Sequence, residues 1–180
     1  MTDRRKTALV LGMTTIFMFS PLAMVLTGYS IPMFQNLGFE RGTLAPRLVW
    51  ILASIIAIAY VLYIMKVIPL VLIKQKEISM FKLLGILAAL VSGIVEEVFF
   101  RRWIMDMLMS GGVNPVIQVI ISGVAFGLAH TLWILVKRDL KFTISAILST
   151  SVLGILLAII YLVGGRNLGP CIFAHILINI

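Results

Sequence analysis

Two adjacent acids and two histidines are the residues of this sequence best suited to chemistry. Glu96 and Glu97 interrupt the apolar run 93–100, and the chain's two histidines, His130 and His175, also fall within apolar runs. Ionisable side chains inside a lipid bilayer are energetically costly, so they are functional-site candidates by default. A poorly solvated carboxylate can serve as a general base, and an imidazole can position or protonate a reacting group. These residues indicate acid–base chemistry within a membrane.

The spacing around the acidic pair indicates different roles for the two carboxylates. Residues four apart share one face of a helix, so Glu97 can pair with Arg101. Glu96 points about 100° away from Glu97 and stays available for another partner. One interpretation is a catalytic base beside a fixed ion pair. The alternative is an ion pair that staples two helices together without any chemistry.

The two histidines each have a polar or aromatic neighbour four residues away. Phe126 precedes His130 by one helical turn, and Asn179 follows His175 by one turn. An imidazole and a carboxamide on one face suit the stabilisation of a developing oxyanion. The alternative for His130 is a core residue whose ring is hydrogen-bonded to a neighbouring backbone carbonyl.

Together these patterns resemble the CPBP family of CAAX proteases and bacteriocin-processing enzymes, also called Abi. The motifs of that family are Glu-Glu-x-x-x-Arg, Phe-x-x-x-His and His-x-x-x-Asn. They occur here in the same order as Glu96-Glu97-x-x-x-Arg101, Phe126-x-x-x-His130 and His175-x-x-x-Asn179. The resemblance covers about residues 82–180, and residues 1–80 resemble nothing that we can name.

The resemblance implies a glutamic intramembrane endopeptidase that cleaves a membrane-associated protein or peptide without a cofactor. Glu96 would activate water with the help of His130. The oxyanion would be stabilised by His175 and Asn179. Three further residues would hold the geometry of the site, namely Glu97, Arg101 and Phe126.

Three other functions remain open from the sequence. Glu96, His130 and His175 could bind zinc with an open position for water, although the usual His-Glu-x-x-His helix is absent. A non-enzymatic immunity or regulatory membrane protein of the same fold is a second alternative, although the motifs are intact. A proton pathway or transporter would use the same buried residues as a relay, but the sequence has no internal repeat.

Composition places the chain among multi-span membrane proteins. Of its 180 residues, 61% are hydrophobic and 12% are charged, whereas a soluble domain is about half apolar and about a quarter charged. The single cysteine, Cys171, excludes an internal disulfide and is interpreted as a small packing residue. We therefore predict an all-α transmembrane bundle that forms one membrane domain over residues 1–180.

The apolar runs predict about five full spans and a short last helix. A span needs about 20 apolar residues. The predicted spans are 7–28, 48–73, 80–104, 115–136 and 142–163, and the short helix is 168–180. With these limits, Glu96 lies ~21 Å and His130 only ~9 Å from the same side at ~1.5 Å per residue. A tilted or broken helix must therefore bring them together.

Basic residues predict the orientation of the chain. Lys and Arg residues cluster at one side of the alternating spans, at the N-terminus, before the third span and before the fifth: Arg4, Arg5, Lys6, Lys74, Lys76, Lys82, Lys137, Arg138 and Lys141. Cytoplasmic loops have such an excess, so we expect a cytoplasmic N-terminus and an outer 29–47 connection. The clusters explain much of the net charge of +8 without nucleic acid. The short chain favours a prokaryotic plasma membrane, and its substrate cannot be read from the sequence.

Small residues at four-residue spacing predict a helix contact. Gly85, Ala89 and Gly93 recur on the third span, and Gly123 and Gly127 on the fourth. Such stripes let two helix backbones approach closely. We expect the third and fourth spans to pack through them.

Overall fold

The computed structural model describes residue 23 and residues 45–69, 79–132 and 139–180. The predicted first span, 7–28, apart from residue 23, and nearly all of the 29–47 connection lie outside these residues, as do most of the basic side chains used for orientation. The described residues form helices joined by turns, with no strand among them.

The described chain is a series of helices, and capping side chains mark the starts of three of them. In chain order they are α3 (Arg47–Val67), α5 (Met80–Glu97), the π-helix η2 (Val98–Met105), α6 (Asp106–Ser110), α7 (Pro115–Ala129), the 3₁₀ turn η3 (His130–Leu132), α9 (Leu140–Val163) and α10 (Gly169–Asn179). Side chains of Ser79, Asn114 and Asp139 accept backbone N–H groups at the starts of α5, α7 and α9. These caps satisfy donors that have no partner inside the helix.

The third predicted span is longer than expected and contains a π-helix. We predicted residues 80–104, whereas α5, η2 and α6 run on as one apolar helix that reaches Ser110. The π segment begins directly after Glu97. Because π turns are rare and often lie at functional sites, their place beside the acidic pair is informative.

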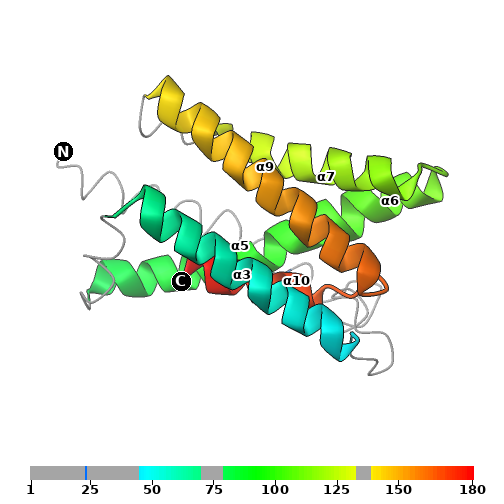
Figure 1. Ribbon diagram of the computed structural model, residues 1–180, viewed down its shortest axis with the longest axis horizontal. Helices are drawn as coiled ribbons and strands as arrows, with labels where there is room; N and C mark the ends of the chain where they lie inside the picture. The colour runs from blue at the N-terminus through cyan, green and yellow to red at the C-terminus, as the bar shows by residue number, and fades with distance from the viewer. Residues whose placement is uncertain (1–22, 24–44, 70–78, 133–138) are drawn as a thin grey trace.

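An all-helical membrane bundle is confirmed, with helices of unequal length. Three described helices are long and apolar enough to cross a membrane: Arg47–Val67, Lys82–Ser110 and Leu140–Val163. The predicted fourth span, 115–136, has its α-helix end at Ala129. Figure 1 shows the starts of α5 and α9 at one end of the bundle, and the turn after α6 and the turn before α10 at the other.

The glycines of α7 pack against α9, which corrects the predicted contact between the third and fourth spans. A methyl group added at Gly123 would lie 2.7 Å from the backbone nitrogen of Ile155, and one added at Gly127 would lie 2.7 Å from the Ile147 carbonyl. Gly154 of α9 faces Gly123 in return. The backbones of α7 and α9 therefore meet through small residues, so the close approach is present but the partner helix differs from the predicted one.

Of the two glycines in the α5 stripe, Gly93 packs against the last helix. A methyl group added at Gly93 would meet the Cγ1 atom of Ile176 at 2.7 Å, whereas one added at Gly85 would meet nothing within 4 Å. A sharp turn precedes α10, with positive φ at Gly165 and Arg166. The turn and the close approach at Gly93 bring α10 alongside the acidic part of α5 (Figure 1).

Candidate active site

The predicted ion pair between Glu97 and Arg101 is present and fully buried. Arg101 Nε lies 3.1 Å from Glu97 Oε2, and neither side chain has any exposed surface. Arg101 Nη2 donates to the Gly154 carbonyl at 3.0 Å, and the guanidinium lies over the Phe126 ring, 4.9 Å from its centroid. The Nε contact is an ion pair without an aligned hydrogen bond, and Nη1 has no acceptor among the described residues. Arg101 thus joins α9 and α7 to the acidic helix.

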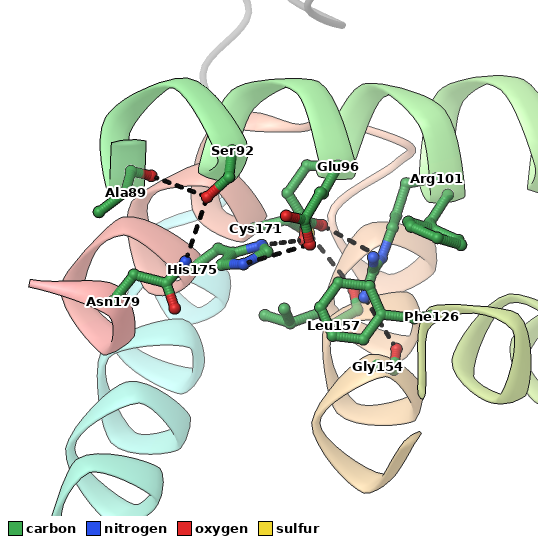
Figure 2. Close-up of polar contacts among 12 residues, drawn as sticks. Ala89, Ser92, Glu96, Arg101, Phe126, Gly154, Leu157, Cys171, His175 and Asn179 are labelled. Carbon is green, nitrogen blue, oxygen red and sulfur yellow. Dashed lines mark hydrogen bonds and ion pairs between the residues drawn. The ribbon is translucent and has the colours of Figure 1, made fainter. Parts of the chain in front are cut away.

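His175 lies between the two carboxylates. Its Nδ1 is 2.7 Å from Glu97 Oε1, and its Nε2 is 3.8 Å from Glu96 Oε2 (Figure 2). Because Glu97 is paired with Arg101, it is an ionised acceptor, and His175 Nδ1–H donates to it. The imidazole is therefore held in one tautomer with Nε2 directed toward Glu96. A carboxylate that fixes an imidazole in this way is common in catalytic sites.

Phe126 packs among the charged and imidazole groups. Its buried ring lies 5.5 Å from the His175 ring and 5.0 Å from the His130 ring, centroid to centroid. Phe100 packs edge-on against the same ring at 5.2 Å. The ring thus connects the fourth predicted span to the third and the last, which explains why an aromatic residue precedes His130 by one turn.

His130 lies at the end of α7, where the helix changes to a 3₁₀ turn. Its Nδ1 donates to the Phe126 carbonyl at 2.8 Å, which leaves Nε2 without that proton in the neutral ring. This is the backbone bond expected for a core histidine, but the ring remains partly exposed and is near enough to Glu96 for electrostatic interaction. Because α7 ends at Ala129 rather than at 136, the depth of His130 that was counted from residue 136 no longer applies.

Asn179 contacts a residue that the sequence analysis did not identify. Its Nδ2 donates to Ser92 Oγ at 3.5 Å, and the Ser92 hydroxyl donates to the Ala89 carbonyl at 3.4 Å (Figure 2). Ser92 precedes Glu96 by one helical turn, so this spacing was a usable signal. The Gly154 carbonyl that binds Arg101 had no such signal, because every residue has a carbonyl.

The site is therefore formed by two helices that cross in opposite directions. Glu97 of α5 meets His175 of α10, and one turn away Ser92 meets Asn179. Glu96 lies beside these two contacts with 18% of its side chain exposed, whereas Glu97 has none exposed. One carboxylate is thus committed to buried partners and the other can reach a substrate or water.

From the sequence, zinc was an alternative to a site without a metal, and the single cysteine was interpreted as a packing residue. Among the described residues, no three His, Cys, Asp or Glu side chains form a group that could hold a metal ion. Cys171 is buried and its Sγ donates to the Leu157 carbonyl at 3.3 Å, in agreement with a packing role.

Comparison with known proteins supports the resemblance drawn from the three motifs. Residues 78–180, more than half of the chain, match the family described as type II CAAX prenyl endopeptidase Rce1-like. All seven motif residues fall within the matched segment. No curated protein and no solved structure matches the chain.

Proposed function

The chain belongs to the Rce1-like family of type II CAAX prenyl endopeptidases, and we propose that it hydrolyses a peptide bond of a membrane-associated protein or peptide. The family supports a protease that acts in the membrane. The single observation that favours a glutamic mechanism is that the two acids differ in burial and in partners. Glu97 is buried between Arg101 and His175, while Glu96 is partly exposed beside His175 Nε2.

In the proposed reaction, Glu96 is the general base. Its carboxylate takes a proton from water, and the resulting hydroxide attacks the carbonyl carbon of the peptide bond. The proton is then transferred to the leaving amine as the carbon–nitrogen bond breaks. His130, whose Nε2 is the unprotonated nitrogen of the neutral ring, helps to position the water.

Asn179 and His175 stabilise the negative charge that develops on the carbonyl oxygen. The carboxamide of Asn179 is exposed and can donate an N–H to the oxyanion. His175 can donate from Nε2 only when the ring is cationic, and Glu97 on Nδ1 offsets that charge. Arg101 holds Glu97 in turn, so it acts on the site through positioning.

Exchange of the base for its amide tests this mechanism. Glu96→Gln keeps the size of the side chain and removes the base, so we expect normal expression and a loss of cleavage of roughly 10²–10⁴-fold. Cleavage of a peptide library in detergent or vesicles, compared with wild type at equal folded concentration, measures the loss. Full activity in Glu96→Gln would contradict the proposal, and absence of activity in wild type would favour the non-enzymatic regulatory alternative.

Zinc dependence is tested separately. We propose that no metal takes part, because Asn179 provides a donor for an oxyanion and Arg101 a fixed cation for a carboxylate. Strong chelators should leave cleavage unchanged, and purified protein should contain no stoichiometric zinc. Loss of cleavage on chelation with recovery on adding zinc would instead assign Glu96, His130 and His175 as ligands.

We further propose that the protein is a multi-pass protein of a prokaryotic plasma membrane with its N-terminus in the cytoplasm. Lys82 and Lys141 lie near the starts of α5 and α9, which are at the same end of the bundle in Figure 1. A cysteine at position 43 should then be labelled only from outside the cell. Labelling only from the cytoplasm would reverse the orientation.

A further inference from the structure

Ser92 contacts Asn179 in a way that can select one orientation of the Asn179 amide. The Ser92 hydroxyl has a single proton, which it donates to the Ala89 carbonyl at 3.4 Å. Toward α10 it can therefore only accept, and it accepts from Asn179 Nδ2 at 3.5 Å. The nitrogen end of the carboxamide is thus directed to α5.

The same helix crossing that forms the acidic site holds Ser92 opposite Asn179. Gly93, the residue after Ser92, has no side chain, and an added methyl group there would lie 3.5 Å from the backbone nitrogen of Ile176. One turn further along α5, Glu97 binds His175 at 2.7 Å. Figure 2 shows Ser92 and Glu96 on the side of α5 that faces α10.

We propose that Ser92 is a positioning residue that fixes the Asn179 carboxamide for stabilisation of the oxyanion. One N–H of Asn179 binds Ser92 and the second remains available to the substrate carbonyl. An amide with the opposite orientation would place Oδ1, an acceptor, near the developing negative charge and would repel it. Because Asn179 is otherwise exposed, loss of Ser92 allows both orientations. This inference rests on the proposed peptidase function.

A double-mutant cycle measures the coupling between the two residues. Removal of an oxyanion donor costs roughly 10²–10³-fold in kcat, and we expect such a loss for Asn179→Ala. Ser92→Ala should lower kcat by about 10-fold with KM within about twofold, because the donor is kept but is correctly oriented for only about a tenth of the time. The double variant should be no slower than Asn179→Ala alone. Additive losses, or an unchanged kcat in Ser92→Ala, would overturn the proposal.

Two further variants separate positioning from helix stability. Ser92→Thr keeps the hydroxyl and should retain most of the activity. Ser110→Ala is the matched control, because Ser110 lies on the same continuous helix and its hydroxyl also donates to the carbonyl three residues earlier, at 2.8 Å from Met107 O. It should leave kcat unchanged. An equal loss in Ser110→Ala, or no recovery in Ser92→Thr, would assign the effect to the helix and overturn the proposal.

Nuclear magnetic resonance of the Asn179 side chain gives a readout that does not depend on activity. The chain has four asparagines, so protein labelled with ¹⁵N at Asn gives few side-chain signals, and Asn179→Ala identifies the relevant pair. In Ser92→Ala these two signals should shift and exchange faster with solvent, while Ser110→Ala leaves them unchanged. Wild-type cleavage with unaltered Asn179 signals in Ser92→Ala would overturn this inference alone. Absence of wild-type cleavage would overturn the proposed function and this inference together.

Discussion

Two charged clusters lie on the same continuous helix, and they differ in burial. The first is the pair Glu97 and Arg101 with His175, in which both members of the ion pair have no exposed surface. The second surrounds Asp106, one residue after the π segment, and its three charged side chains are about a quarter exposed. The helix therefore places one cluster inside the bundle and the other near its end.

The second cluster, here called the Asp106 cluster, consists of Asp106, Arg166, Tyr161, Gln118 and Arg102. Arg166 Nη1 lies 2.5 Å from Asp106 Oδ1, and Arg166 Nη2 donates to Gln118 Oε1 at 2.7 Å. The Tyr161 hydroxyl donates to Asp106 at 3.1 Å, and Gln118 donates to the Val113 carbonyl at 2.7 Å. These bonds join α6 to α7 and to the turn that leads into α10.

The two clusters also differ in how completely their charged groups are paired. In the Asp106 cluster each oxygen of the acid has at least one partner. In the buried cluster, Arg101 Nη1 has no acceptor among the described residues, and Glu97 is shared between a guanidinium and an imidazole. Buried charges with incomplete hydrogen bonding reduce stability, so their presence favours a functional requirement. Three substitutions test this difference, from the largest expected loss of stability to the smallest.

The largest effect is expected for Arg101→Ala. This change leaves Glu97 buried beside His175 without its cation, and breaking a buried pair costs about 3–5 kcal/mol. The variant should express poorly and lose most of its thermal stability in detergent. Glu96→Gln is the control, since Glu96 is partly exposed and lies outside the pair. Equal loss of stability in both variants would remove the distinction between the two acids.

An intermediate effect is expected for Asp106→Ala. It leaves the buried Tyr161 hydroxyl and the partly exposed Arg166 without their shared acceptor, and only Arg166 can be hydrated instead. We expect a loss of about 1–3 kcal/mol in unfolding free energy, measured by thermal unfolding in the same detergent. Because the cluster lies away from Glu96, the kcat of the folded fraction should change little. A larger loss than in Arg101→Ala would contradict the assigned roles.

The smallest effect is expected for Arg102→Ala. Arg102 Nη1 lies 3.5 Å from Asp106 Oδ2, and its side chain is 27% exposed. Such pairs contribute about 0–1 kcal/mol, since water competes with the partner and the long side chain loses freedom. The losses of stability in Arg102→Ala and Arg101→Ala can be compared directly, since both residues are arginines on the same helical turn. A loss similar to that of Arg101→Ala would show that burial does not separate the two clusters.

Local features of the site followed from the sequence because they depend only on helical spacing. The contact between Glu97 and Arg101 was predicted and is present, as is the shared face of Phe126 and His130. The membrane class and the helical fold followed from long apolar runs, which have few other stable structures in a bilayer. The resemblance to a CAAX protease family followed from the three motifs and is confirmed by the match over residues 78–180.

Contacts between helices could not be predicted from helical spacing in the same way. Gly123 and Gly127 predicted a close approach of two helices, but their partner is α9 and not α5. A stripe of small residues indicates only that another backbone can come near, and it does not indicate which one. The catalytic roles of Glu96, His130, His175 and Asn179 remain predictions, although the structure places His175 directly against both acids.

The sequence by itself determined which residues could do chemistry, which lie on one helix face and that the chain spans a membrane, because periodicity and apolar length are local properties. Only the tertiary structure decided that His175 binds Glu97 through Nδ1, that the Gly154 carbonyl holds Arg101, and that Ser92 meets Asn179. These contacts join residues 53 to 87 positions apart. They depend on how α5, α9 and α10 cross, and a crossing is fixed by the packing of all the helices together.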